Sequence, residues 1–169
     1  RELSKNLYSI IKKMPKKSHP MDVARTAVSV MGLEDKETPD SSPEANMRKA
    51  IRILAKTPTA LAAFYRVRKG QKILKPKKNL NMAENFFYMC FGKVPQKEIV
   101  KAFDVSLILY AEHGFNVSTF TARTITSSLS DIHGAITGAI ASLKGPLHGG
   151  ANEEVMHMMN KIKKPENAL

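Results

Sequence analysis

The sequence is poor in cysteine and in long hydrophobic runs. Its one cysteine, Cys90, excludes an intramolecular disulfide and favours a reducing compartment. Cys90 lies in the apolar run 86–91, where a free cysteine is usually a small core residue rather than a nucleophile. The stretch 132–143 carries no Asp, Glu, Lys or Arg but is too short to span a bilayer. The opening letters RELSK lack the apolar core of a secretory signal. We therefore expect a cytoplasmic protein without a membrane partner, with the mitochondrial matrix as the less favoured location.

Acidic residues are also few. Only 15 of them oppose 27 lysines and arginines, so the formal net charge is +12. Such a charge suits nucleic acid, a membrane surface or anionic small molecules. The densest basic run, RVRKGQKILKPKK at 66–78, contains no aromatic residue on which a base could stack. We interpret it as a solvated loop and expect no nucleic-acid partner.

Apolar residues recur at helical spacing along the chain, and no segment alternates as a strand would. Proline, glycine and capping residues divide this pattern into about nine helices. The expected ranges are 3–13, 20–31, 43–55, 58–69, 81–92, 95–112, 117–129, 132–144 and 153–163. With 43% hydrophobic residues, the 169-residue chain can bury one core. The predicted fold class is an all-α, orthogonally packed multi-helix domain.

Two of these helices have unusual composition. The helix 95–112 is apolar on nearly all sides, which predicts a central position. The helix 132–144 carries no charged residue before Lys144 and is rich in glycine and alanine, which permits close helix packing. We expect it to be deeply buried or to form a subunit interface.

The stretch KGPLHGGANEE at 144–154 is the strongest candidate site. Pro146 stiffens the turn, while Gly149 and Gly150 allow a sharp bend and a close approach to a ligand. Asn152 is a suitable N-cap for the helix that follows. A helix N-terminus disfavours the imidazolium, so we expect His148 to be neutral and able to donate a hydrogen bond to a developing enolate. The alternative is a capping turn whose histidine is merely exposed.

A second turn, EHGFN at 112–116, has the same ingredients. It presents His113, and Asn116 can cap the next helix. Two imidazoles beside two helix N-termini could together bind a small carboxylate. No two histidines have the spacing of a helical metal site and no Cys–His cluster exists, so we expect no metal.

The other histidines receive structural interpretations. We expect His133 and His157 to be ordinary surface or interface residues, and His19 to help cap a helix.

The motifs taken together resemble the citrate synthase and 2-methylcitrate synthase family. The similarity rests on GPLHGGANE at 145–153, AEHGFNVSTFTAR at 111–123, HPMDV and RTAVS at 19–29, and AENFFYM at 83–89. It covers essentially the whole chain. The resemblance implies a condensation of an acyl-CoA, acetyl-CoA or propionyl-CoA, with oxaloacetate, in which acyl-CoA is a substrate and no cofactor is needed. It further implies that His148 hydrogen-bonds the thioester carbonyl, that His113 and Asn116 bind the oxo acid, and that helices around 117–144 form a homodimer.

One part of the family pattern has no match. The second catalytic histidine, the aspartate base and the carboxylate-binding arginines of the family lie downstream of the motif at 145–153. We therefore expect residues 1–169 to be part of the large helical domain, without the small domain and the N-terminal segment, and to be inactive alone. The alternatives are a basic helical binding module for nucleic acid or an anionic surface, and a non-catalytic dimerisation fragment.

Overall fold

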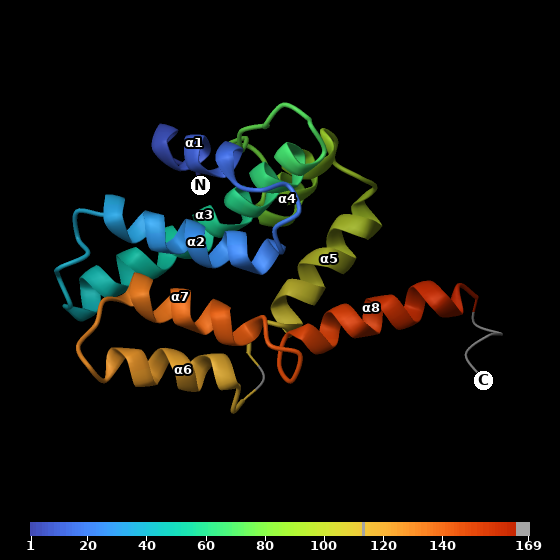
Figure 1. Ribbon diagram of the computed structural model, residues 1–169. Coiled ribbons are helices and arrows are strands. Elements are labelled where there is room, and N and C mark those ends of the chain that lie inside the picture. The colour runs from blue at the N-terminus through green and yellow to red at the C-terminus, as the bar shows by residue number, and fades with distance from the viewer. Residues whose placement is uncertain (113, 165–169) are drawn as a thin grey trace.

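The computed structural model describes residues 1–112 and 114–164, and all its regular structure is helical (Figure 1). The helices are α1 (Lys5–Lys13), α2 (Pro20–Glu34), α3 (Pro43–Arg68), α4 (Met82–Phe91), α5 (Lys97–Leu109), α6 (Val117–Thr126), α7 (Ile132–Leu143) and α8 (Gly150–Ile162). The predicted all-α class is confirmed, whereas the predicted nine helices are eight within the described residues. None of these described helices is both long and apolar enough to cross a membrane.

The helices form a layered body from which the last one projects. In Figure 1, α2, α7 and α6 lie one below another, α1 lies above them, and α5 runs steeply along one side. Helix α8 leads away from this body toward the C-terminus. Most of the core lies between α1, α2 and α3, where Leu7, Ile11, Val23 and Phe64 are buried.

Side chains that satisfy free backbone N–H groups define several helix starts. His19 caps α2 by accepting the Met21 N–H on its Nδ1 at 3.2 Å, as predicted. Asn81 and Glu84 form a reciprocal capping box at the start of α4. Asp131 caps α7, which confirms the expected start of that helix. These ends could be read from local sequence because each depends on contacts within four residues.

The structure has one helix, α3, where the sequence predicted two helices separated at 57–59. Pro58 lies inside a continuous helix of 26 residues. Proline removes one backbone donor and normally breaks a helix. Here Ile53, before the proline, and Ala60 and Phe64, after it, are all buried. Burial of apolar surface on both sides of Pro58 offsets the lost hydrogen bond.

Helix α5 corrects a second prediction, since it is not central in the described structure. Only Val100 is buried, and Ile108 and Leu109 are 68% and 71% exposed. Phe103 anchors the helix by packing on Phe86 and Phe87 of α4, with ring centroids 5.5 and 5.1 Å apart. Its remaining apolar face is uncovered by the part of the chain that the structure describes.

The small residues around α7 serve close packing within the chain. A Cβ added to Gly32 of α2 would lie 2.8 Å from the Cβ of His133 on α7. A Cβ on Gly138 would overlap Ile125 of α6. Gly32 was expected to end its helix, but α2 continues to Glu34 because the glycine sits at this helix crossing. Helix α7 is therefore held between α2 and α6.

His133 is a core residue of the chain, whereas the sequence predicted an ordinary surface or interface residue. It is only 2% exposed. Its Nε2 lies 3.7 Å from Asp35 at the end of α2, and Asp35 forms an ion pair with Arg52 of α3 at 2.8 Å. Helical position alone could not show this burial, because it depends on which face α7 turns toward α2.

The buried His133 makes folding sensitive to mild acid. Burial lowers its pKa; Asp35 and Asp131 oppose this shift, and Lys49 and Arg52 reinforce it. The neutral ring is thus favoured in the fold, while an unfolded histidine titrates near its ordinary pKa of about 6.5. The associated stability is present above that pH and is lost as the pH falls below it.

We expect the melting temperature to fall less between about pH 7.5 and about pH 5.5 in His133→Phe than in the parent chain. The phenyl ring keeps an aromatic group at this position without a titrating proton. His157→Phe, on exposed α8, is the control and should retain the parent pH dependence. An unchanged pH dependence in His133→Phe would contradict the assignment.

Candidate active site

The loop between α7 and α8 is closed by its own backbone. The N–H groups of His148 and Gly150 both donate to the Gly145 carbonyl, at 3.0 and 3.1 Å. A Cβ on Gly149 would overlap the Leu143 carbonyl oxygen and lie 2.7 Å from Leu143 Cδ1. The Gly-Gly pair therefore permits close approach of the loop to the end of α7, whereas the sequence suggested close approach to a ligand.

The half-buried His148 ring reaches the start of α6. Its Nε2 lies 3.3 Å from the Ser118 backbone nitrogen and 3.0 Å from Ser118 Oγ. A backbone N–H can only donate, so Nε2 is the acceptor and the proton of a neutral ring is on Nδ1. The ring faces the N-terminus of α6. The sequence had instead suggested that it lies at the N-terminus of the helix that follows the loop.

Asn116 caps α6 and lies beside the Ser118 hydroxyl. Its Oδ1 accepts the Thr119 N–H at 2.6 Å, which confirms the predicted cap. The same oxygen lies 3.0 Å from Ser118 Oγ. The Ser118 hydroxyl thus lies within hydrogen-bond distance of both Asn116 and His148, and its one proton goes to one of these two acceptors at a time. Sequence analysis missed Ser118, although its place two residues after the cap was a usable signal.

Two predictions for the site, the convergence of His113 and the cap by Asn152, are not confirmed. His113 lies outside the described residues, so its predicted convergence with His148 stays a prediction. Gly114, the next residue, has a left-handed φ of 81°, which glycine adopts without strain. Asn152 is not the N-cap of α8, because that helix already begins at Gly150. The tight turn around Gly145 brings the helix start forward.

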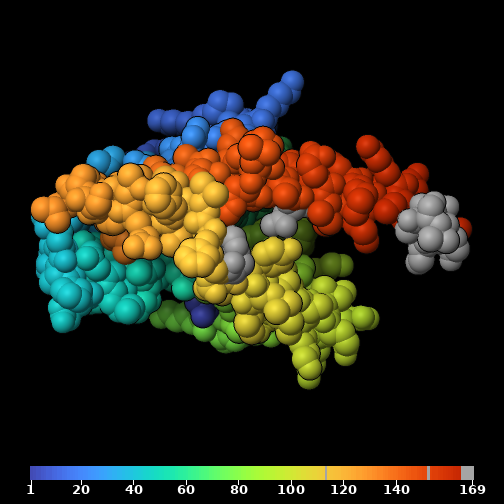
Figure 2. All heavy atoms as spheres, turned by 90° about the horizontal axis from the view of Figure 1, so that it is seen from below, coloured from blue at the N-terminus to red at the C-terminus, as the bar shows by residue number. Residues whose placement is uncertain are grey.

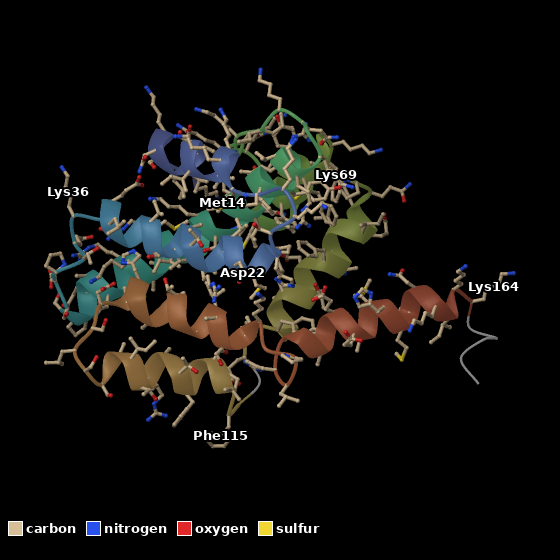
Figure 3. All side chains as sticks on the ribbon, viewed as in Figure 1. Met14, Asp22, Lys36, Lys69, Phe115 and Lys164 are labelled. Atoms are coloured by element: carbon tan, nitrogen blue, oxygen red, sulfur yellow. The ribbon has the colours of Figure 1, made fainter. Side chains whose placement is uncertain are left out.

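An open hollow of about 430 Å³ lies at the start of α6. Its lining includes Asn116, Thr119, Phe120 and Arg123. The lower face of the molecule, with α6 along one side and α5 and α8 on the other, is shown in Figure 2. Phe115 points outward from this end of α6 in Figure 3. The hollow contains the Arg123 cation and lies at the positive end of the α6 dipole, which suits a small anion.

The structure thus defines a class of all-α proteins in which a loop imidazole is held against the capped start of a neighbouring helix. The family sequence model described as "Citrate synthase, C-terminal domain" matches residues 1–169. The chain belongs to the citrate synthase family.

Individual relatives agree with this assignment. The chain is 51% identical over 168 residues to 2-methylcitrate synthase of Mycobacterium tuberculosis, covering 99% of this chain and 42% of the relative. It resembles the crystal structure of citrate synthase from Pyrobaculum aerophilum with a TM-score of 0.87 and 34% identity, over 99% of this chain and 44% of that one. The chain also resembles citrate synthase of Thermoplasma acidophilum, whose structure is a ternary complex with carboxymethyl coenzyme A and oxaloacetate. The TM-score is 0.85 at 29% identity, over 98% of this chain and 43% of that one.

Proposed function

We propose that this chain contributes one part of the active site of a citrate synthase or 2-methylcitrate synthase. In this reaction a base removes a proton from the α-carbon of acetyl-CoA or propionyl-CoA. The resulting enol attacks the keto carbon of oxaloacetate and a carbon–carbon bond forms. Hydrolysis of the thioester then releases CoA and citrate or 2-methylcitrate. Acyl-CoA is a substrate here, and the proposal includes no cofactor or metal.

The observation that carries this proposal is the contact between His148 and Ser118. Because Nε2 accepts the Ser118 N–H, Nδ1 is the nitrogen that can donate. A neutral imidazole donor stabilises the negative charge that builds on a thioester oxygen during enolisation. His148 therefore serves as the catalytic hydrogen-bond donor in the proposal.

We place the oxo acid at the start of α6. Asn116 and Arg123 line the hollow there, and the helix N-terminus adds a favourable field for a carboxylate. His113 belongs to the same proposal on the strength of the family motif. The related Thermoplasma acidophilum enzyme was crystallised with oxaloacetate and a coenzyme A analogue, which supports both ligand classes.

We further propose that the rest of the catalytic set comes from sequence outside residues 1–169. The chain spans 42% of the Mycobacterium tuberculosis relative. The family resemblance assigns the aspartate base, the second histidine and the arginines to the part downstream. The uncovered apolar faces of α5 and α8, including Leu109 and Met156, give that part surfaces on which to pack.

The test is formation of citrate and 2-methylcitrate from oxaloacetate by the complete polypeptide that contains this chain. Acetyl-CoA and propionyl-CoA are compared as alternative donors, and CoA release is followed with a thiol reagent. We expect condensation with at least one of them. Absence of CoA release with both, from a folded protein, would contradict the proposal.

The basic run 66–78 has structural uses that weaken the binding-module alternative. Arg66 donates to the Cys90 carbonyl at 3.1 Å, and Arg68 donates to the Lys16 carbonyl at 3.0 Å. Lys75 pairs with Glu2 at 2.5 Å, and Lys77 lies 4.2 Å from the centre of a tyrosine ring. Four of the seven cations in this run are thus engaged within the chain.

We also propose that α6 and α7 form a homodimer interface. Helix α6 buries no residue within the described chain, and Phe120 is 71% exposed on it. An uncovered helix that carries exposed apolar side chains such as Val117 and Phe120 suits contact with a second copy of the same surface.

Phe120→Glu is expected to weaken self-association about a hundredfold, because it places a charge in the proposed apolar interface. Sedimentation velocity across a concentration series measures the effect. Leu33→Glu is the control, since Leu33 is similarly exposed on α2. A monomeric parent chain, or an equal loss in the control, would contradict this interface.

A further inference from the structure

The first turn of α2 contacts the His148 loop on both sides. Lys144, just before the loop, places Nζ 2.7 Å from Asp22 Oδ2. Glu153, in the first turn of α8, places Oε2 3.3 Å from His19 Nε2. His19 and Asp22 are separated by less than one helical turn. Figure 3 shows Asp22 where α2 faces α7.

The contact before the loop joins two helix ends of opposite polarity. Asp22 lies in the first turn of α2, and its other oxygen is 2.9 Å from Arg25. Lys144 is the C-cap of α7. Each charge therefore complements the dipole of its own helix as well as its partner. The Lys144 hydrogen bond lowers the pKa of Asp22, so this carboxylate stays ionised at neutral pH.

The contact after the loop uses a histidine whose orientation is already fixed. His19 Nδ1 accepts the Met21 N–H at the α2 cap, so in the neutral ring Nε2 carries the proton. That proton points to the Glu153 carboxylate. One ring thereby caps α2 and holds the start of α8.

We propose that Asp22 and His19 are positioning residues that fix the two ends of segment 144–153 and so direct the His148 imidazole. The inference rests on the proposed function, because a directed imidazole has catalytic value only if it meets a substrate. Helix α2 thus acts on catalysis through the loop, without touching substrate.

The solvent exposure of the two ion pairs distinguishes a positioning role from a contribution to the stability of the fold. The side chains of Lys144 and Glu153 are 38% and 56% exposed, and ion pairs this open to solvent add little to stability. Catalysis is more sensitive, since a displacement of about 1 Å can reduce a rate about a hundredfold. Loss of an anchor should therefore affect the loop and the rate more than the fold.

The first arm of the test measures the loop itself in residues 1–169. Lys144→Met removes the charge and keeps most of the side-chain length, and Asp22→Asn removes the same pair from the other side. The amides of His148 and Gly150, which donate to Gly145, should exchange about tenfold faster in both variants. The ¹⁵N shifts of the His148 ring should move away from the Nδ1–H tautomer. Lys144→Arg should restore the parent values.

The matched control is Lys75→Met, which breaks a lysine–glutamate pair at 2.5 Å away from the loop. It should leave the His148 exchange rate and ring shifts unchanged. Parent-like exchange and ring shifts in folded Lys144→Met and Asp22→Asn would overturn the proposal, whatever their activity.

The second arm measures condensation by the complete polypeptide. We expect Lys144→Met to lower kcat about ten- to a hundredfold, with the KM for oxaloacetate within about twofold of the parent. If no variant and no parent protein condenses substrate, the proposed function fails, and the exchange data alone decide whether α2 positions the loop. Faster exchange with an unchanged kcat would overturn the catalytic part of the inference.

Discussion

His148→Ala is expected to lower kcat for the proposed condensation about a thousandfold. The imidazole is the hydrogen-bond donor to the thioester oxygen, and removal of one such donor costs about 10²–10³ in kcat. The substitution should leave the fold intact, because the ring is only half-buried and reaches the body through Ser118. Initial rates of CoA release, with thermal unfolding measured in parallel, give the two quantities needed.

His157→Ala is the control for this substitution. His157 lies on the same C-terminal segment but is exposed on α8 and contacts only Glu153 among the ion pairs of the described structure, at 3.9 Å. It should retain parent activity. If His148→Ala keeps more than about a tenth of the parent kcat, the catalytic assignment of His148 is wrong.

Gly149→Ala is expected to lower kcat about a hundredfold through a different cause. The φ of Gly149 is −68°, so alanine can adopt its backbone conformation. The difficulty is contact, since the new methyl group would overlap the Leu143 carbonyl oxygen. A backbone oxygen in the last turn of α7 cannot move alone, so the loop must shift and carry His148 with it.

Gly145→Ala is the matched control within the same loop. Its Cβ would lie 3.2 Å from the Ser142 carbonyl oxygen, a contact that a small adjustment relieves. We expect less than about a tenfold loss of kcat in this variant. Equal losses in both variants would show that any added methyl disturbs the loop and would remove the specific role of the Leu143 contact.

Features that depend on neighbours in the sequence were predicted well. The caps by His19, Asn116 and Asp131 follow from polar side chains placed just before apolar helical segments. The burial of Cys90 was also predicted, and burial raises the pKa of its thiol to about 11, which keeps it protonated and unreactive at neutral pH.

Features that depend on which surfaces meet were predicted less well. Pro58 suggested a helix break, but buried residues on both sides keep α3 continuous. The apolar composition of α5 suggested a central helix, yet the described chain covers little of it. The helical position of His133 suggested a surface or interface residue, but its side chain packs against Gly32 of α2 and is buried. The composition of a helix shows how much apolar surface it could bury. Which part of that surface is buried depends on the helices that pack against it.

The candidate site divides in the same way. The sequence by itself determined that His148 stands on a stiff Gly-rich loop and that Asn116 caps a helix, because these properties need only backbone geometry and short-range hydrogen bonds. Only the tertiary structure brought Ser118 to the ring, 30 residues away, and so showed that the proton of a neutral ring would be on Nδ1. It also placed the first turn of α2 against both ends of the loop, with Asp22 122 residues from Lys144. Contacts at such separations arise from the packing of whole helices, and local sequence carries no record of them.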